Sequence, residues 1–224
     1  MMHAACLFTR LVWMVLGAVP APADIPMVPQ DPDPAYTKVI EERAGKIAQT
    51  LGIDDAVKRR QVQDIIAEQY RNLGMVQDAC DEQIKAIQGR SDIEEETKKF
   101  SIQTLKETSQ TLRQRLHTRY LVRLSALLTP AQIEKVKDGM TYGLVQVTYN
   151  SYLEMLPELT EEQKGVIRAY LVEAREMAMD ASSSNEKHQW FGKYKGRINN
   201  YLSSQGYDLK KASEARNSRR QSQN

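Results

Sequence analysis

The stretch VKRRQVQDIIAEQYRNLGMVQDACDEQIKAI, residues 57–87, decides the fold of this chain. Its apolar residues recur every three or four positions and so form one continuous stripe along a helix. The stripe, which includes one glutamine, consists of Val57, Val62, Ile65, Ile66, Gln69, Leu73, Val76, Cys80, Ile84 and Ile87. No proline interrupts the stretch, and a break follows it from Gly89 to Asp92. The pattern therefore predicts one long amphipathic helix.

A second long helix is predicted directly after this break. Its apolar residues show the same spacing and are Ile102, Leu105, Leu112, Leu116, Tyr120, Leu124 and Leu127. Two long helices joined by a short connection pack side by side in opposite directions. The sequence thus predicts a long antiparallel helical hairpin.

Shorter elements flank this hairpin. An amphipathic pattern predicts a helix over residues 35–51, and further short helices follow the hairpin up to residue 202. The segment 141–149 contains Gly143 and the β-branched Val145, Val147 and Thr148, so we expect it to be extended. The predicted fold class is all-α, in a single helical domain over residues 35–208. The Ser-, Gln-, Asn- and Arg-rich residues 209–224 are expected to form a disordered basic tail.

Two phrases mark helix starts in the C-terminal half. Leu-Thr-Pro-Ala-Gln at 128–132 and Leu-Thr-Glu-Glu-Gln at 159–163 both place Thr at the cap and Gln three positions later. The Thr side chain accepts a backbone N–H of the first turn, and the Gln side chain bonds back to the cap residue. The paired phrases resemble the Leu-Thr-x-x-Gln motifs of small helical periplasmic chaperones. That resemblance implies a holdase or envelope-stress adaptor, with unfolded envelope proteins as partners.

The N-terminus has the form of a secretion signal. Arg10 precedes a short apolar run at 11–19, and Ala21-Pro22-Ala23 has the small-x-small pattern of a cleavage site. We expect a signal peptide over 1–23, a Pro-rich linker over 24–34, and an exported protein, periplasmic or extracellular. No later stretch is long and apolar enough to span a membrane. Cleavage leaves Cys80 as the single cysteine, so no intramolecular disulfide is expected.

The composition argues against several functional classes. The net charge of +2 is too small for a nucleic-acid-binding protein that is also exported. His117 and His188 are the histidines that remain after cleavage, and no metalloprotease, serine-hydrolase or phosphate-loop motif is present. We therefore predict no catalytic residues, no metal and no cofactor. A Lys/Tyr/His/Arg eliminase site near His188 is a remote alternative.

The best candidate surface lies in the basic, aromatic segment 187–201. On a helical wheel, Phe191, Tyr194, Ile198, Tyr201 and Leu202 share one face, which we assign to the core. The adjoining face supplies flat rings and hydrogen-bond donors, which suit sugar C–H groups and hydroxyls. The predicted carbohydrate-binding residues are Trp190, Lys193, Tyr194, Arg197 and Asn200. The alternative is that Trp190 and the tyrosines are ordinary core aromatics.

Residues 187–207, with Lys-Val-Lys-Asp-Gly-Met-Thr-Tyr-Gly at 135–143, are similar to an uncharacterised family of exported bacterial helical proteins. That family is a domain of unknown function for which sugar binding has been suggested. The resemblance implies a non-catalytic exported protein that binds polysaccharide or oligosaccharide. The chaperone reading and a polysaccharide-active enzyme such as a lyase remain the alternatives. The sequence leaves the oligomeric state open.

Overall fold

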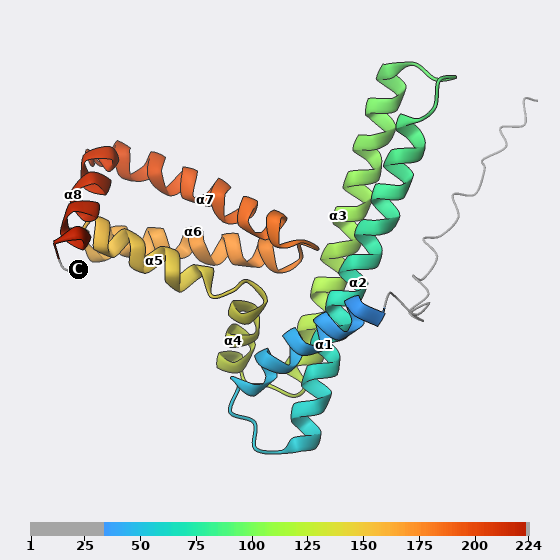
Figure 1. The fold of residues 1–224 in the computed structure, drawn as a ribbon, viewed down its shortest axis with the longest axis horizontal. Coiled ribbons are helices and arrows are strands. Elements are labelled where there is room, and N and C mark those ends of the chain that lie inside the picture. Colours follow the sequence, from blue (N-terminus) through green and yellow to red (C-terminus); the bar gives the residue numbers. More distant parts are fainter. Residues whose placement is uncertain (1–33, 223–224) are drawn as a thin grey trace, which may run out of the picture.

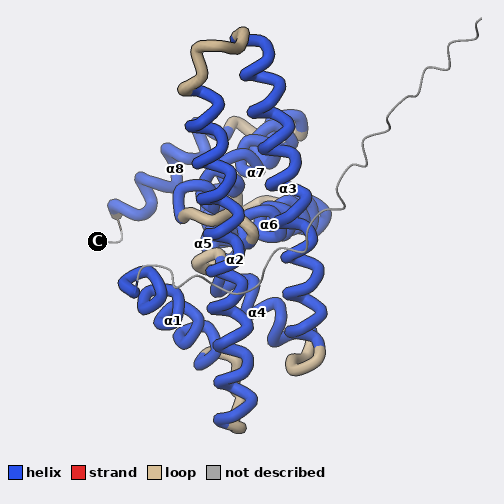
Figure 2. Tube along the Cα trace, turned by 90° about the vertical axis from the view of Figure 1, so that its right-hand side faces the viewer, coloured by secondary structure: helices blue, strands red, loops and turns tan. Residues whose placement is uncertain are grey.

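The computed structural model describes residues 34–222, and within this range every regular element is an α-helix (Figure 2). The helices form two arms that meet at an angle (Figure 1). The N-terminal arm consists of α1 (Pro34–Gln49), α2 (Ala56–Gln88), α3 (Glu95–Ser125) and α4 (Pro130–Met140). The C-terminal arm consists of α5 (Leu144–Met155), α6 (Glu161–Met179), α7 (Ser184–Ser204) and α8 (Leu209–Gln221). The all-α prediction is confirmed for the described residues.

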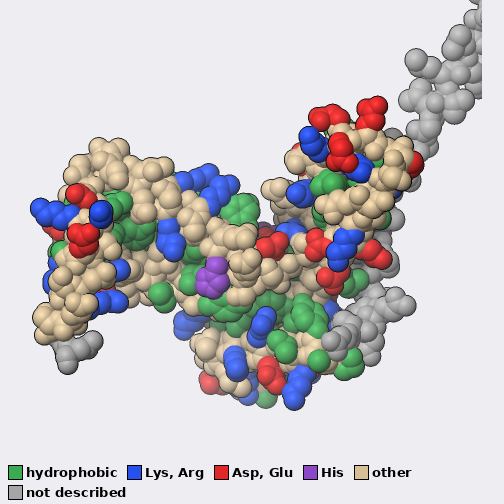
Figure 3. Space-filling view, turned by 45° about the horizontal axis from the view of Figure 1, so that its top comes forward, with side chains coloured by type: hydrophobic (Ala, Val, Ile, Leu, Met, Phe, Trp, Pro, Cys, Tyr) green, Lys and Arg blue, Asp and Glu red, His purple; other side chains and the backbone are tan. Residues whose placement is uncertain are grey.

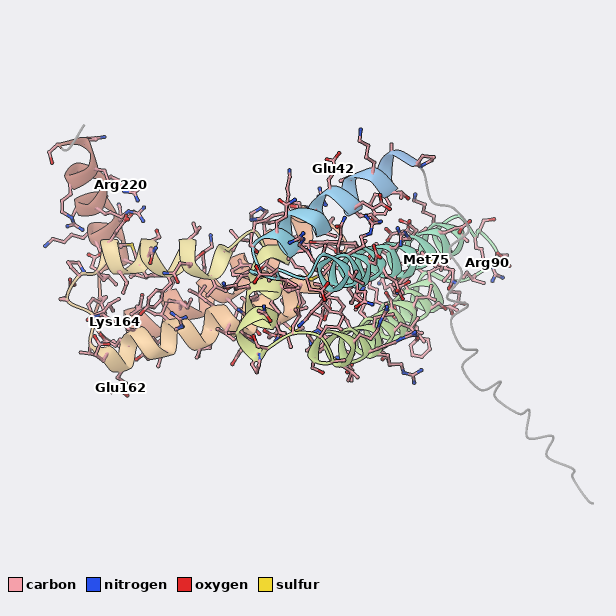
Figure 4. The ribbon with its side chains drawn as sticks, turned by 90° about the horizontal axis from the view of Figure 1, so that it is seen from below. Glu42, Met75, Arg90, Glu162, Lys164 and Arg220 are labelled. Carbon is pink, nitrogen blue, oxygen red and sulfur yellow. The ribbon has the colours of Figure 1, made fainter. Side chains whose placement is uncertain are left out.

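Figure 4 shows the same division from below. Glu42, Met75 and Arg90 lie on the N-terminal arm, whereas Glu162, Lys164 and Arg220 lie at the far end of the C-terminal arm. One apolar core is centred on the base of the hairpin and includes Met179 from α6, and a second lies between α5, α6 and α7. The molecule is therefore built as two helical packings joined at one corner.

The predicted hairpin is present as α2 and α3. The lower part of its stripe is fully buried against α1 and α4, with Ile66 and Leu124 inaccessible to solvent. Toward the tip the stripe is only partly covered, and Phe100 is 74% exposed. Charged side chains of both signs gather around this tip (Figure 3). The distal hairpin is therefore a single layer of two helices.

Both capping predictions are confirmed. Thr129 Oγ1 accepts the backbone N–H of Gln132 at 3.3 Å, and Thr160 Oγ1 accepts that of Gln163 at 3.2 Å. The side-chain carbonyl oxygen of each Gln accepts a hydrogen bond from the backbone N–H of its Thr at 3.0 Å. Gln132 Nε2 also donates to the carbonyl of Leu51, which ties the start of α4 to the end of α1. The phrases therefore fix where α4 and α6 begin.

The prediction of an extended segment at 141–149 is wrong. Tyr142 and Gly143 adopt left-handed φ angles of 59° and 66° and turn the chain into α5, which begins at Leu144. The helix propensities of Val and Thr fall only a few tenths of a kcal/mol to about 0.7 kcal/mol below that of Ala. Burial of Val145 and Tyr152 in the C-terminal core outweighs this small cost.

The prediction of a disordered tail is also wrong, because residues 209–221 form α8. Asp208 caps this helix by accepting the backbone N–H of Lys211. Arg216 donates to the hydroxyl of Ser151, and Arg219 donates to the carbonyl of Glu154, so α8 is held against α5. The basic side chains that suggested a solvated tail instead satisfy the C-terminal end of α5.

The predicted signal peptide at 1–23 lies outside the described residues. So does the predicted linker at 24–34, except for Pro34, which begins α1. Among the helices described, none combines the length and the apolarity needed to cross a membrane.

A matched pair of glycine variants tests the close approach of α4 to α1. A Cβ atom on Gly139 would lie 2.8 Å from Cγ1 of Ile47, which is buried in the core and cannot move aside. We expect Gly139→Ala to lower the free energy of unfolding by about 1–2 kcal/mol. Gly165→Ala, in the second turn of α6 with open space around it, should raise that free energy by about 0.5–1 kcal/mol. Urea unfolding measures both, and equal effects at the two sites would contradict the close contact.

Candidate functional site

A pocket of about 310 Å³ lies where the two arms meet. The molecular surface is visibly hollowed between the hairpin and the C-terminal arm (Figure 3). Helices α2 and α3 form one wall of the pocket, and the end of α6 and the start of α7 form the other. The pocket therefore depends on the docking of both arms.

The hairpin wall is mainly polar. Lys106, Ser109, Gln110 and Arg113 line the pocket from α3 at the three- and four-residue spacing that places side chains on one helix face. Ser109 is only 5% exposed. Helix α2 adds Gln77, Cys80, Asp81 and Ile84 at the same spacing. The helix faces that are buried near the base of the hairpin therefore line the pocket in this part of it.

The opposite wall is mainly apolar. Met177 comes from the last turn of α6, Ala181 from the loop after it, and Trp190 from the second turn of α7. The indole of Trp190 is half-buried, packs against the core of the C-terminal arm and still lines the pocket. Lys193 Nζ lies 4.9 Å from the centre of the Trp190 ring. The half-buried indole therefore lies opposite the polar side chains of α3, with the Lys193 ammonium over its ring.

Several buried polar atoms of the pocket residues have no hydrogen-bond partner. They are the hydroxyl of Ser109, Nε of Arg113 and Oδ1 of Asp180. A buried polar group without a partner costs about 1–3 kcal/mol, so such groups mark places where a ligand or water completes the site. Three such atoms therefore belong to residues that line this one pocket.

The acidic side chains at the pocket are already engaged. Gln77 Nε2 donates to Asp81 at 2.9 Å, and the backbone N–H of Ser182 donates to Glu186 at 3.1 Å. Oδ2 of Asp180 lies 2.9 Å from Nδ1 of His117 on α3. This carboxylate raises the pKa of His117 against the opposing effect of burial. The Asp180–His117 pair also links the hairpin to the end of α6.

The sequence-predicted site residues separate into three groups. Trp190 lines the pocket. Lys193, Arg197 and Asn200 lie on the exposed face of α7, and Arg197 lies 4.6 Å from the ring centre of Tyr194. Tyr194 itself is 7% exposed and belongs to the core, so its ring offers no open face to a ligand. Of the predicted set, only Trp190 is brought to the pocket.

The polar wall on α3 was missed by the sequence analysis. Ser109 occupies the position in the apolar stripe between Leu105 and Leu112, where the 3–4 spacing calls for an apolar residue. A polar residue in that register was the available signal. Arg113, Gln110 and Lys106 carried no signal of their own, because exposed helix faces are normally polar.

A second group of side chains lies beside the start of α7. The ring of Tyr142 stacks on that of His188 with 6.0 Å between their centres. The neighbouring Lys187 is 2% exposed, and its Nζ donates to the carbonyls of Ala178 and Met179. Lys187 therefore caps the end of α6 and is not presented to a ligand at the surface.

The fold and the pocket together define a class of protein: two all-α arms with a ligand-sized pocket at their junction. This chain belongs to the DUF3826 family of proteins of unknown function, which its residues 37–222 match. No curated protein matches the chain. The predicted membership of an uncharacterised helical family is thereby confirmed, whereas sugar binding stays a prediction.

Proposed function

We propose that this protein is an exported, non-catalytic carbohydrate-binding protein whose ligand lies in the pocket between the arms. The observation that carries the proposal is the combination of a half-buried indole with unpartnered polar atoms across one pocket. Sugars present C–H faces that pack on aromatic rings and hydroxyls that form directed hydrogen bonds. Trp190 would supply the ring, and Ser109, Arg113 and Asp180 would supply the partners for hydroxyls.

The size of the pocket limits the ligand. Small-molecule pockets have volumes of about 300–1,000 Å³, so a pocket of about 310 Å³ is at the lower limit of this range. This volume suits one or two sugar rings. We therefore favour a short oligosaccharide or one end of a polysaccharide chain.

The pocket is a better ligand site than the exposed face of α7. Arg197 is within 3.9 Å of Glu173 and also contacts the Tyr194 ring, so its guanidinium already has partners. Lys193 and Asn200 lie on open helix surface, where a bound sugar would bury little area. Trp190 is the residue that the exposed face and the pocket have in common.

Tryptophan fluorescence against a panel of glycans tests the proposal. In residues 24–224 Trp190 is the sole tryptophan, because Trp13 lies in the proposed signal peptide. We expect a saturable change with one class of glycan. Trp190→Ala, followed by calorimetry, should weaken binding at least about tenfold, and Ser109→Ala should also weaken it. Asn200→Ala on the exposed face is the matched control and should bind like the wild type.

Two results would contradict the proposal. If folded Trp190→Ala and Ser109→Ala variants retain full glycan affinity, the pocket is not the binding site. If no glycan in a broad panel changes the fluorescence or produces heat, carbohydrate binding itself is rejected.

The distal hairpin favours a second candidate function, that of a chaperone-like protein. Phe100 is 74% exposed, and the apolar stripe near it is only half-covered. Exposed apolar surface on long helices suits capture of unfolded chains. A holdase would slow aggregation of an unfolded client at equimolar dose, and Phe100→Ser should reduce that effect. No slowing by the wild type would remove this candidate.

A further inference from the structure

We infer that the sugar bound between the arms carries a carboxylate, as a uronic acid does, and that Arg113 receives this carboxylate. The inference rests on the proposed function and adds the chemical class of the ligand. Its basis is the state of the charged groups around the pocket. Each carboxylate there has at least one contact within the protein, whereas Lys106 and Arg113 of α3 have no carboxylate partner among the described residues.

The cations are Lys106 and Arg113, seven residues apart on the same face of α3. Among the described residues, neither has a carboxylate oxygen within 4.0 Å, although Arg123 farther along α3 pairs with Glu68 at 2.8 Å. The guanidinium of Arg113 bonds only through Nη2 to the side-chain oxygen of Gln77, and its buried Nε has no partner. Two positive charges in the polar wall are therefore available to an anion.

Among the described residues, no carboxylate of the pocket forms an ion pair with these cations. Asp180 faces His117, Asp81 accepts from Gln77, and Glu186 accepts from Ser182. Binding an anion at Arg113 breaks none of these contacts. A guanidinium binds a planar carboxylate through charge-assisted hydrogen bonds, which are about twice as strong as those between neutral groups.

The arrangement also fits the shape of a uronic acid. Ser109 lies one helical turn before Arg113 on the same face of α3, and both residues line the pocket. Trp190 forms the opposite wall. A sugar ring lying on the indole would direct its ring carboxylate toward Arg113 and a neighbouring hydroxyl toward Ser109.

The test compares each acidic sugar with its own neutral form. Short oligomers of galacturonic, glucuronic and mannuronic acid are titrated calorimetrically, each beside the same oligomer after reduction of its carboxyl groups to alcohols. We expect at least one acid to bind at least about tenfold more tightly than its reduced form. Arg113→Gln should abolish this preference, and Arg113→Lys should retain part of it because the charge remains.

Arg115→Gln is the matched control, since Arg115 is an exposed arginine on α3 outside the pocket, and it should leave the preference unchanged. Circular dichroism and thermal unfolding establish that each variant is folded. Equal binding of acid and reduced forms, or binding only of neutral glycans, overturns the carboxylate inference and leaves the proposed function standing. A preference that survives Arg113→Gln overturns the role of Arg113. Absence of binding to every glycan rejects the proposed function itself.

Discussion

Replacing Arg175 by Met should lower the free energy of unfolding by about 3 kcal/mol. The Arg175 side chain is 4% exposed, donates to Asp138 at 2.7 Å and to Glu176 at 3.1 Å, and also contacts Glu134. Burial alone would lower the pKa of Arg175, but the hydrogen bonds to Asp138 and Glu134 outweigh burial and raise it. Removing one partner of a buried ion pair costs about 3–5 kcal/mol. Because the carboxylates that pair with Arg175 are themselves partly exposed, the expected loss of stability is at the lower end of this range.

Urea unfolding of Arg175→Met beside Arg60→Met measures this effect. Arg60 pairs with Asp64 at 3.0 Å, but both side chains are more than half exposed, so its loss should cost less than about 0.5 kcal/mol. A loss below about 1 kcal/mol for Arg175→Met would show that the remaining carboxylates rehydrate freely. In that case apolar contacts and the Lys137–Glu176 ion pair suffice to hold α4 and α6 together.

The buried Lys187 should make the stability of the protein depend on pH. Burial lowers the pKa of Lys187 to about 8, whereas in the unfolded chain it is near its usual value of about 10.4. Between these values the unfolded chain binds more protons, so stability rises with pH. The stabilisation is complete above the unfolded pKa and is lost as the pH falls through the folded pKa. We expect a rise of about 2 kcal/mol between about pH 7.5 and pH 9.5.

Unfolding of the wild type and of Lys187→Met across this pH range isolates the lysine. The variant should lack the rise, because Met does not titrate. Lys193→Met, an exposed lysine on the same helix, should retain it. Parallel curves for the wild type and Lys187→Met would show that Lys187 is hydrated in the folded protein.

Local signals predicted much of the fold. The 3–4 spacing in residues 57–87 and 102–127 predicted the hairpin, and the Thr and Gln of each box predicted where α4 and α6 begin. The two errors share a cause, since both segments were judged on intrinsic propensity alone. Burial of Val145 and the contacts of Arg216 and Arg219 with α5 come from parts of the chain that are distant in sequence.

The candidate site was much less predictable. Trp190 attracted attention because of its chemistry, but its partners Ser109 and Arg113 lie about eighty residues earlier. Periodicity shows which residues share a helix face and does not show which other helix that face meets. Only the angle at which the arms meet brings α3 and α7 together. The polar Ser109, at a position where the helical spacing calls for an apolar residue, was the one clue that the sequence offered.

The single chain crossing between the arms, at Tyr142 and Gly143, has a consequence for the order of assembly. Each arm is continuous in sequence, and apart from Met179 of α6, which packs in the core of the N-terminal arm, the buried residues of each core come from its own arm, so most packing within an arm is local. The pocket needs residues from both arms and is completed only when they dock. A ligand bound in the pocket would therefore stabilise the docking of the two arms rather than either arm alone, and its affinity would measure that docking.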